Sequence, residues 1–183
     1  MIWLRRALDG LYLGAGMMAG VFLIAILVMM MAMSIGREFS INIKSGDDIT
    51  AWCMAAMSFL GLAHTFKSGE MIRVGLLTER LRGRTKWAFE VFALAMAAIF
   101  IGFFAWHAID QNMLSWKLND MSQGVLAIPL WIPQLGFTSG IVILLIAIVD
   151  ELCRVLVGLK PTYEKEPPKT AEELIERAVA SGV

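Results

Sequence analysis

The chain has 183 residues, of which 58% are hydrophobic and 17% charged, and its mean hydropathy is +0.68. Soluble domains carry about 45–50% apolar and about 25% charged residues, so this composition excludes an ordinary soluble domain. Sixteen Lys and Arg residues balance 16 Asp and Glu residues, which leaves no basic excess for binding nucleic acid.

Four uncharged blocks contain most of the apolar residues and predict four membrane-spanning helices. They cover 11–35, 49–66, 91–109 and 125–149. A helix rises about 1.5 Å per residue and must cross about 30 Å of hydrocarbon. The second and third blocks therefore just span the membrane, while the first and fourth are long enough to tilt. Because backbone groups in lipid must bond within their own segment, we expect an all-α integral membrane protein.

The Lys and Arg residues are divided unequally between the two sides of these spans. Thirteen of them lie on one side: before the first block, between the second and third blocks, and after the fourth. The other three lie in the two remaining connections. The positive-inside rule then places both termini in the cytoplasm. The first block is far longer than the apolar core of a secretory signal, which has about 7–15 residues, so we expect an uncleaved anchor.

The inner connection, 67–86, predicts a short interfacial helix. Its apolar residues Met71, Val74, Leu77 and Leu81 recur on one helical face. Arginines elsewhere on that helix would meet anionic headgroups on the cytoplasmic side. A basic loop that only sets the topology is the alternative.

The outer connection, 110–124, carries a polar stripe opposite an apolar one. The polar stripe consists of Asn112, Ser115, Asn119 and Ser122. Such a segment either prolongs the third span, lies on the outer surface as a short interfacial helix, or forms a solvated turn. The polar stripe is the candidate for an extracytoplasmic docking contact.

Residues 159–183 differ in character from the transmembrane domain that we expect over residues 1–158. Prolines at 161, 167 and 168 interrupt this segment, and charges of both signs dominate it. Thr170 and Glu173 match a capping box, which predicts one short helix in an otherwise frayed cytoplasmic tail.

The spans offer little for catalysis or for binding a cofactor. His64 and His107 lie near opposite ends of their spans, so they cannot jointly hold a haem or a metal ion. No carboxylate falls in the middle of a block, where ion coupling would require one. Pro129 and Pro133 interrupt the fourth block near its outer end, where they either start the helix or act in gating. We expect no enzymatic activity, no cofactor and no metal.

Two motifs carry a family resemblance. Residues 61–81, GLAHTFKSGEMIRVGLLTERL, and residues 122–140, SQGVLAIPLWIPQLGFTSG, resemble the small membrane subunit (DctQ-type) of tripartite ATP-independent periplasmic (TRAP) transporters. The resemblance covers roughly residues 5–157. It departs from the family pattern at Met71, where His is frequent, and at Gly75, where Asp is frequent.

The resemblance implies a role without catalysis in the bacterial inner membrane. In that family, a large membrane subunit carries the substrate and sodium sites, and the small subunit braces it. A periplasmic binding protein delivers the organic acid, and the sodium gradient drives its import. Large subunit, binding protein and membrane lipid are therefore the expected partners.

The same resemblance implies roles for residues at the two ends of the subunit. Lys67, Glu70 and Arg73 would fix the inner loop through charge pairs and headgroup contacts, at the joint with the large subunit. The outer start of span four, near the docking binding protein, would be shaped by Ile128, Pro129, Trp131 and Pro133. Maintenance of the fold within this subunit alone is the open alternative for both sets.

Two other functions stay open. A self-contained oligomeric carrier would need an ionisable or unwound site at mid-membrane, which the sequence lacks. A membrane anchor of a redox complex would be recognised by a cofactor that purifies with it.

Overall fold

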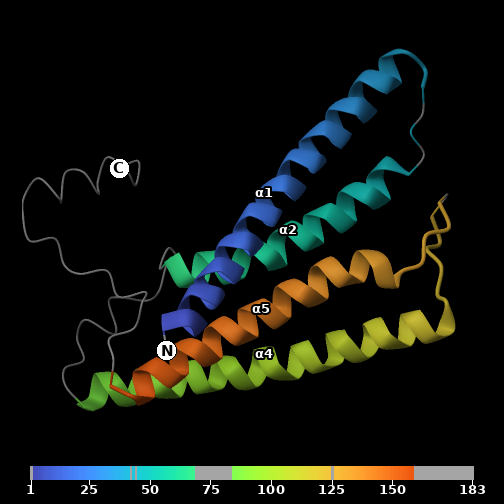
Figure 1. Ribbon diagram of the computed structural model, residues 1–183. Helices are drawn as coiled ribbons and strands as arrows, with labels where there is room; N and C mark the ends of the chain where they lie inside the picture. The colour runs from blue at the N-terminus through green and yellow to red at the C-terminus, as the bar shows by residue number, and fades with distance from the viewer. Residues whose placement is uncertain (1, 42, 44, 69–83, 125, 159–183) are drawn as a thin grey trace, which may run out of the picture.

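The computed structural model describes residues 2–41, 43, 45–68, 84–124 and 126–158. Its four helices are α1 (Ile2–Glu38), α2 (Gly46–Ser68), α4 (Arg84–Leu118) and α5 (Trp131–Leu156) (Figure 1). All four are long and apolar enough to cross a membrane. The predicted all-α membrane fold with four spans is therefore confirmed. Both cytoplasmic termini and the domain boundary after residue 158 stay predictions, and the inner helix expected around 69–83 and the tail lie outside the described residues.

We name the helix ends by the orientation that the charges predict: the inner end is where α2 ends and α4 begins, and the outer end is the opposite one. The helices differ from the uncharged blocks at their ends. α4 continues to Leu118, so the outer connection begins by prolonging the third span. α5 begins only at Trp131, and residues 126–130, which the fourth block included, are outside it. Pro133 lies in the first turn of α5, where a helix does not need the N–H group that proline lacks. The prolines therefore mark where this helix starts.

The same C-terminal capping motif ends both α1 and α4 at the outer end. Ser40 and Asn119 follow these helices with left-handed φ angles of 58° and 49°. The next residue then donates its N–H back into the last turn: Ile41 to the Gly36 carbonyl at 2.8 Å, and Asp120 to the Ser115 carbonyl at 3.1 Å. These are Schellman motifs, which satisfy carbonyls that the helix leaves unpaired.

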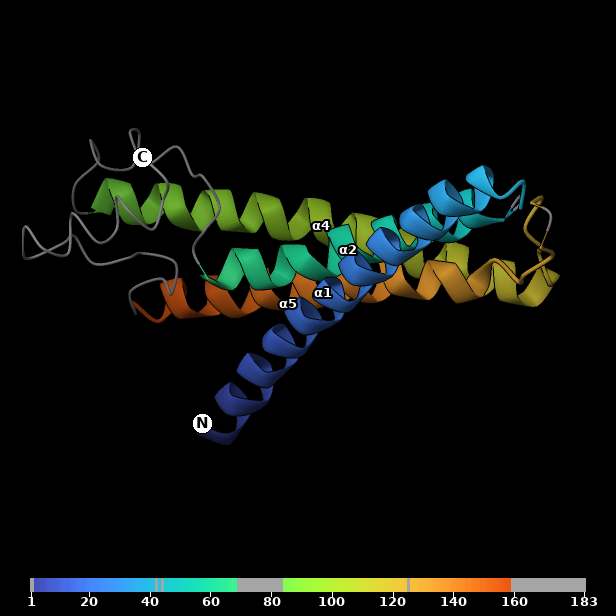
Figure 2. The ribbon, with the colours of Figure 1, turned by 90° about the horizontal axis from the view of Figure 1, so that it is seen from above.

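The helices form an open row in the order α1, α2, α5, α4. α2 packs against α1 and α5, while α4 packs mainly against α5. α1 crosses the other helices obliquely, so that its N-terminal turns diverge from them (Figure 2). A closed four-helix bundle would bring α1 against α4, whereas this row leaves both outermost helices widely uncovered.

Small residues allow the closest approaches between neighbouring helices. A Cβ atom on Gly140 of α5 would lie 2.5 Å from the Phe59 carbonyl carbon and 2.7 Å from the Leu60 nitrogen of α2. On α1, a Cβ on Gly16 would lie 2.8 Å from Cγ of His64. Real Cβ atoms do not come this close to other heavy atoms, so only glycine at these positions lets the neighbouring helices lie this close together.

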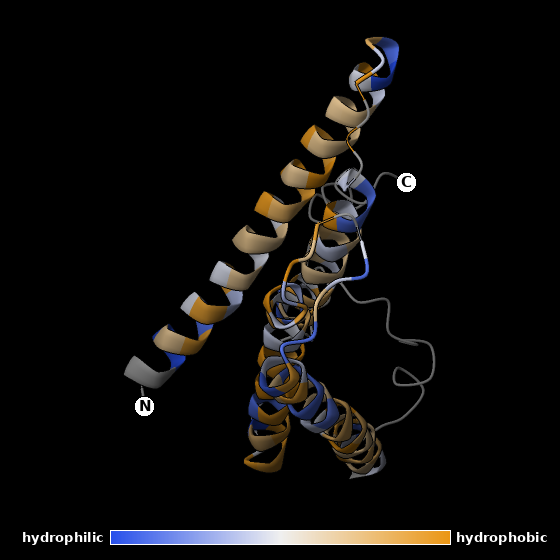
Figure 3. Cartoon of the chain, turned by 90° about the vertical axis from the view of Figure 1, so that its right-hand side faces the viewer, coloured by the Kyte–Doolittle hydropathy of each residue, from blue (hydrophilic) through white to orange (hydrophobic). Residues whose placement is uncertain are grey.

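Apolar side chains cover most of the surface of the row. In the most apolar 18-residue stretch of α1, 6% of the residues are buried, against 33% in α5. Figure 3 shows α1 hydrophobic along its middle and hydrophilic at both ends. α1 is thus the span with the most area available to lipid or to another membrane protein.

We expect the substitution Gly140→Ala to lower the midpoint of thermal unfolding in detergent, because the added methyl group meets the α2 backbone and the helices must separate. Overpacking of this kind costs about 1–3 kcal/mol. Gly10→Ala is the matched control, since a Cβ there has nothing within 4 Å. Equal midpoints for the two variants would contradict the packing described here.

Candidate functional site

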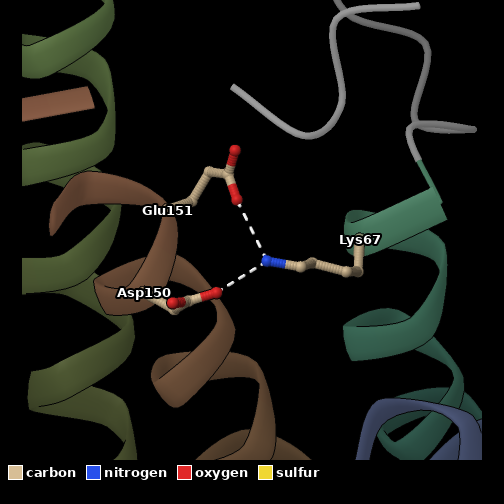
Figure 4. A network of polar contacts seen from close by, with 3 residues as sticks. All are labelled: Lys67, Asp150 and Glu151. Atoms are coloured by element: carbon tan, nitrogen blue, oxygen red, sulfur yellow. Dashed lines mark hydrogen bonds and ion pairs between the residues drawn. The ribbon is translucent and has the colours of Figure 1, made fainter. Parts of the chain in front are cut away.

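An ion-pair cluster joins α2 to α5 at their inner ends. Nζ of Lys67 lies 2.6 Å from Oδ2 of Asp150 and 3.2 Å from Oε2 of Glu151 (Figure 4). The Lys67 side chain is 12% exposed and the Glu151 side chain 0%. One ammonium therefore lies between two carboxylates that are partly or fully withdrawn from solvent, and removing it would take a positive charge away from both of them.

Tyr12 extends this cluster to α1. Its ring is buried, and the Lys67 ammonium lies 5.4 Å from the ring centroid, within cation–π range. Its hydroxyl group has no hydrogen-bond partner among the described residues. Lys67, which α2 carries, therefore contacts both α1 and α5.

The inner start of α4 is attached to α5 as well. Nε1 of Trp87 donates a hydrogen bond to the Val155 carbonyl at 3.0 Å, near the end of α5. One turn into α4, Lys86 and Glu90 form an i,i+4 ion pair at 3.8 Å. All four helices are thus connected at this end of the row.

Sequence reasoning identified Lys67 but missed its partners. Asp150 and Glu151 come directly after the fourth uncharged block, and Lys67 directly after the second. Since both positions fall on the same side of the membrane, opposite charges there were a usable signal. Glu70 and Arg73 lie outside the described residues, so their pairing stays a prediction.

A short hairpin connects α4 to α5 at the outer end. The Leu130 N–H donates to the Asp120 carbonyl at 2.9 Å, and the Ser122 N–H donates to the Ile128 carbonyl at 2.9 Å. Met121 and Pro129 face each other between these bonds as an isolated bridge. Pro129 is tolerated at this position because its neighbours make the hydrogen bonds, and the N–H group that proline lacks is not needed.

The structure brings the two predicted outer sets together at one contact. Nδ2 of Asn112 donates to the Trp131 carbonyl at 3.4 Å, across the outer ends of α4 and α5. The predicted residues at the start of span four are all half-buried: Ile128, Pro129, Trp131 and Pro133. They line the passage from the hairpin into α5.

The polar stripe does not form one outward face. Ser115 is buried, Asn112 is half-buried, and both continue the α4 face that carries Ala105 and Ala108. Asn119 is exposed and occupies the left-handed position that ends α4. Oγ of Ser122 accepts a hydrogen bond from the Gly124 N–H at 3.3 Å. Each stripe residue therefore takes part in building this end of the molecule.

The hairpin also approaches the outer start of α2. A Cβ atom on Gly124 would collide with the Asp48 carboxylate. Among the described residues, no group of three or more His, Cys, Asp or Glu side chains could hold a metal ion. The polar contacts at this end hold the hairpin against the ends of α2, α4 and α5.

Comparison with known proteins decides the family. The family model for the DctQ component of tripartite ATP-independent periplasmic transporters matches residues 26–158. The chain belongs to the DctQ family. This match includes all of α2, α4 and α5 together with the outer part of α1. No curated protein and no solved structure matches the chain.

Membership gives this DctQ component a place in transport. The family is a component of TRAP transporters and not an enzyme family. Four spanning helices together with that membership indicate a multi-pass membrane protein. The resemblance noted in the two sequence motifs is therefore confirmed.

We expect Lys67→Met to destabilise the subunit strongly, because the buried Glu151 and the partly buried Asp150 would lose the ammonium group that lies between them. Breaking a buried ion pair in this way costs about 3–5 kcal/mol. Lys86→Met, which breaks a more exposed pair, is the control and should cost far less. Thermal unfolding in detergent measures both. Recovery in the triple variant Lys67→Met, Asp150→Asn, Glu151→Gln would support this cause, and equal effects of the two single variants would contradict it.

Asn119 allows a second test. Asn119→Gly should keep the stability of the subunit, because Gly adopts a left-handed φ readily. Asn119→Val should lower stability by about 1–2 kcal/mol, because a β-branched residue is strained there. A loss of binding-protein affinity in a fully stable Asn119→Gly variant would show instead that the Asn119 side chain contacts the partner.

Proposed function

We propose that this DctQ component is the small scaffold subunit of a sodium-driven importer of organic acids, and that it braces the large transport subunit. Family membership supports the class of transporter. The observation that carries the scaffold role is the open row of helices joined at its inner end by Lys67 and Trp87. A brace needs a broad apolar surface and a fixed shape.

The distribution of charge supports the absence of a transport site in this chain. Among the described residues, the carboxylates of the spanning helices lie toward helix ends and none lies near the middle of a span. Carboxylates at mid-membrane are costly and are kept where ion coupling needs them. We therefore assign the sodium and substrate sites to the large subunit.

The ends of the row supply the partner contacts in this proposal. At the inner end, Lys67 holds the last turn of α2, and Glu70 and Arg73, which follow in the sequence, bind the large subunit and the headgroups. At the outer end, Pro129 and Trp131 give the hairpin its direction. The hairpin then helps to receive the periplasmic binding protein.

Reconstitution tests the proposed function. Sodium-driven uptake would be measured in proteoliposomes holding this chain alone, the large subunit alone, or both, each with the binding protein supplied. We expect uptake only with both membrane subunits. Uptake by this chain alone would contradict a scaffold role, and full uptake by the large subunit alone would contradict an essential brace.

A substitution in the predicted inner-loop motif (Lys67, Glu70 and Arg73) tests the contact with the large subunit separately. We expect Arg73→Ala to weaken co-purification with the large subunit while membrane insertion is unchanged. Arg82→Ala, an arginine in the same loop but outside the matching family positions, is the control. Wild-type assembly and uptake in Arg73→Ala would remove Arg73 from the proposed contact.

A further inference from the structure

Two tryptophans give the depth of α4 in the membrane. Trp87 and Trp106 are both exposed and lie 19 residues apart in one continuous helix. At about 1.5 Å per residue they are about 28 Å apart, close to the thickness of the hydrocarbon core. Trp side chains favour the two membrane–water interfaces, so this pair marks where α4 enters and leaves the hydrocarbon.

The outer end of α4 extends well past this boundary. α4 continues twelve residues beyond Trp106 to Leu118, a further distance of about 18 Å. The headgroup layer on each side is only about 5–8 Å thick. The last turns of α4 and the following hairpin therefore stand in water, at the end of the molecule shown on the right of Figure 1. We call residues 113–124 and 126–130 the outer knob.

The outer knob is firmly built and yet exposes large apolar side chains. It contains the Schellman motif at Asn119 and the two hairpin hydrogen bonds described above. Its Trp116 is 62% exposed, and Leu118, Met121 and Leu126 are exposed as well. Lipid tails do not reach this height, so these apolar side chains face water when the knob is unbound. Contact with an apolar surface of another protein removes them from water, which is favourable.

Charge around the knob favours a protein over a lipid surface. The outer ends of α2 and α4 and the hairpin carry four described carboxylates against the single ammonium of Lys117. These carboxylates belong to Asp47, Asp48, Asp110 and Asp120. Anionic headgroups would be repelled by this excess, whereas lysines and arginines on a soluble protein would be attracted.

We propose that the outer knob docks the soluble binding protein through an apolar contact centred on Trp116, with Asp48 and Asp120 at the same end of the molecule. The inference rests on the proposed function and adds to it the surface and its chemistry. The partner presents an apolar patch surrounded by basic residues. The polar stripe of α4 supports the knob from inside and does not itself make the contact.

The test measures the affinity of the binding protein for the complex of both membrane subunits in lipid nanodiscs. We expect Trp116→Ala to raise Kd about tenfold or more, as loss of a central aromatic contact does. Trp106→Ala is the matched control: this tryptophan is 74% exposed but lies at the membrane boundary, so Kd should not change. The double variant Asp48→Asn, Asp120→Asn should weaken the dependence of Kd on salt.

The outcomes separate this inference from the proposed function. An unchanged Kd in Trp116→Ala, in a complex that assembles and imports normally, overturns the docking surface alone. Equal effects of Trp116→Ala and Trp106→Ala overturn it too, because the effect would then come from the membrane boundary. Failure of the wild-type subunits to form a complex overturns the proposed function and the docking surface together.

Discussion

The structure depends most on one ammonium group placed between two carboxylates at the inner end of the helix row. Lys67 reaches Asp150 and Glu151 on α5 and the ring of Tyr12 on α1. Apolar packing in a membrane is weakly directional, because lipid tails compete for the same surfaces. A charge withdrawn from solvent accepts only a few arrangements of its partners, so this cluster fixes which helices meet and at what height.

Glycine contacts and side-chain hydrogen bonds fix the positions of neighbouring helices elsewhere along the row. Glycines allow backbone approach at Gly16 and Gly140, where a methyl group would push the helices apart. Trp87 attaches the start of α4 to the end of α5, and Asn112 attaches their outer ends. A single layer of helices can thus keep its shape without closing into a bundle, which suits a subunit that supports a larger neighbour.

The sequence predicted the number, type and approximate position of the spans, because long uncharged blocks have few alternatives in a membrane. It did not predict the open row, since four apolar helices can be ordered in several ways and the order depends on contacts between small residues. The inner-loop motif includes Lys67, but its pairing with Asp150 and Glu151 depends on α2 and α5 being neighbours, which the order of the spans along the chain does not determine. The polar stripe was interpreted as a surface; Ser115 proved to be buried because α4 continues without a break and keeps its packed face toward α5.

The central claim is that this DctQ component keeps one shape while the large subunit moves. The most direct measurement is the distance between spin labels on Met18→Cys in α1 and Ile99→Cys in α4, in a background without Cys53 and Cys153. Distances would be recorded in the assembled transporter with and without sodium, substrate and binding protein. The account predicts a single narrow distribution that is the same in all conditions. A shift of several ångströms on adding sodium and substrate would contradict it, because the row would then take part in the transport movement.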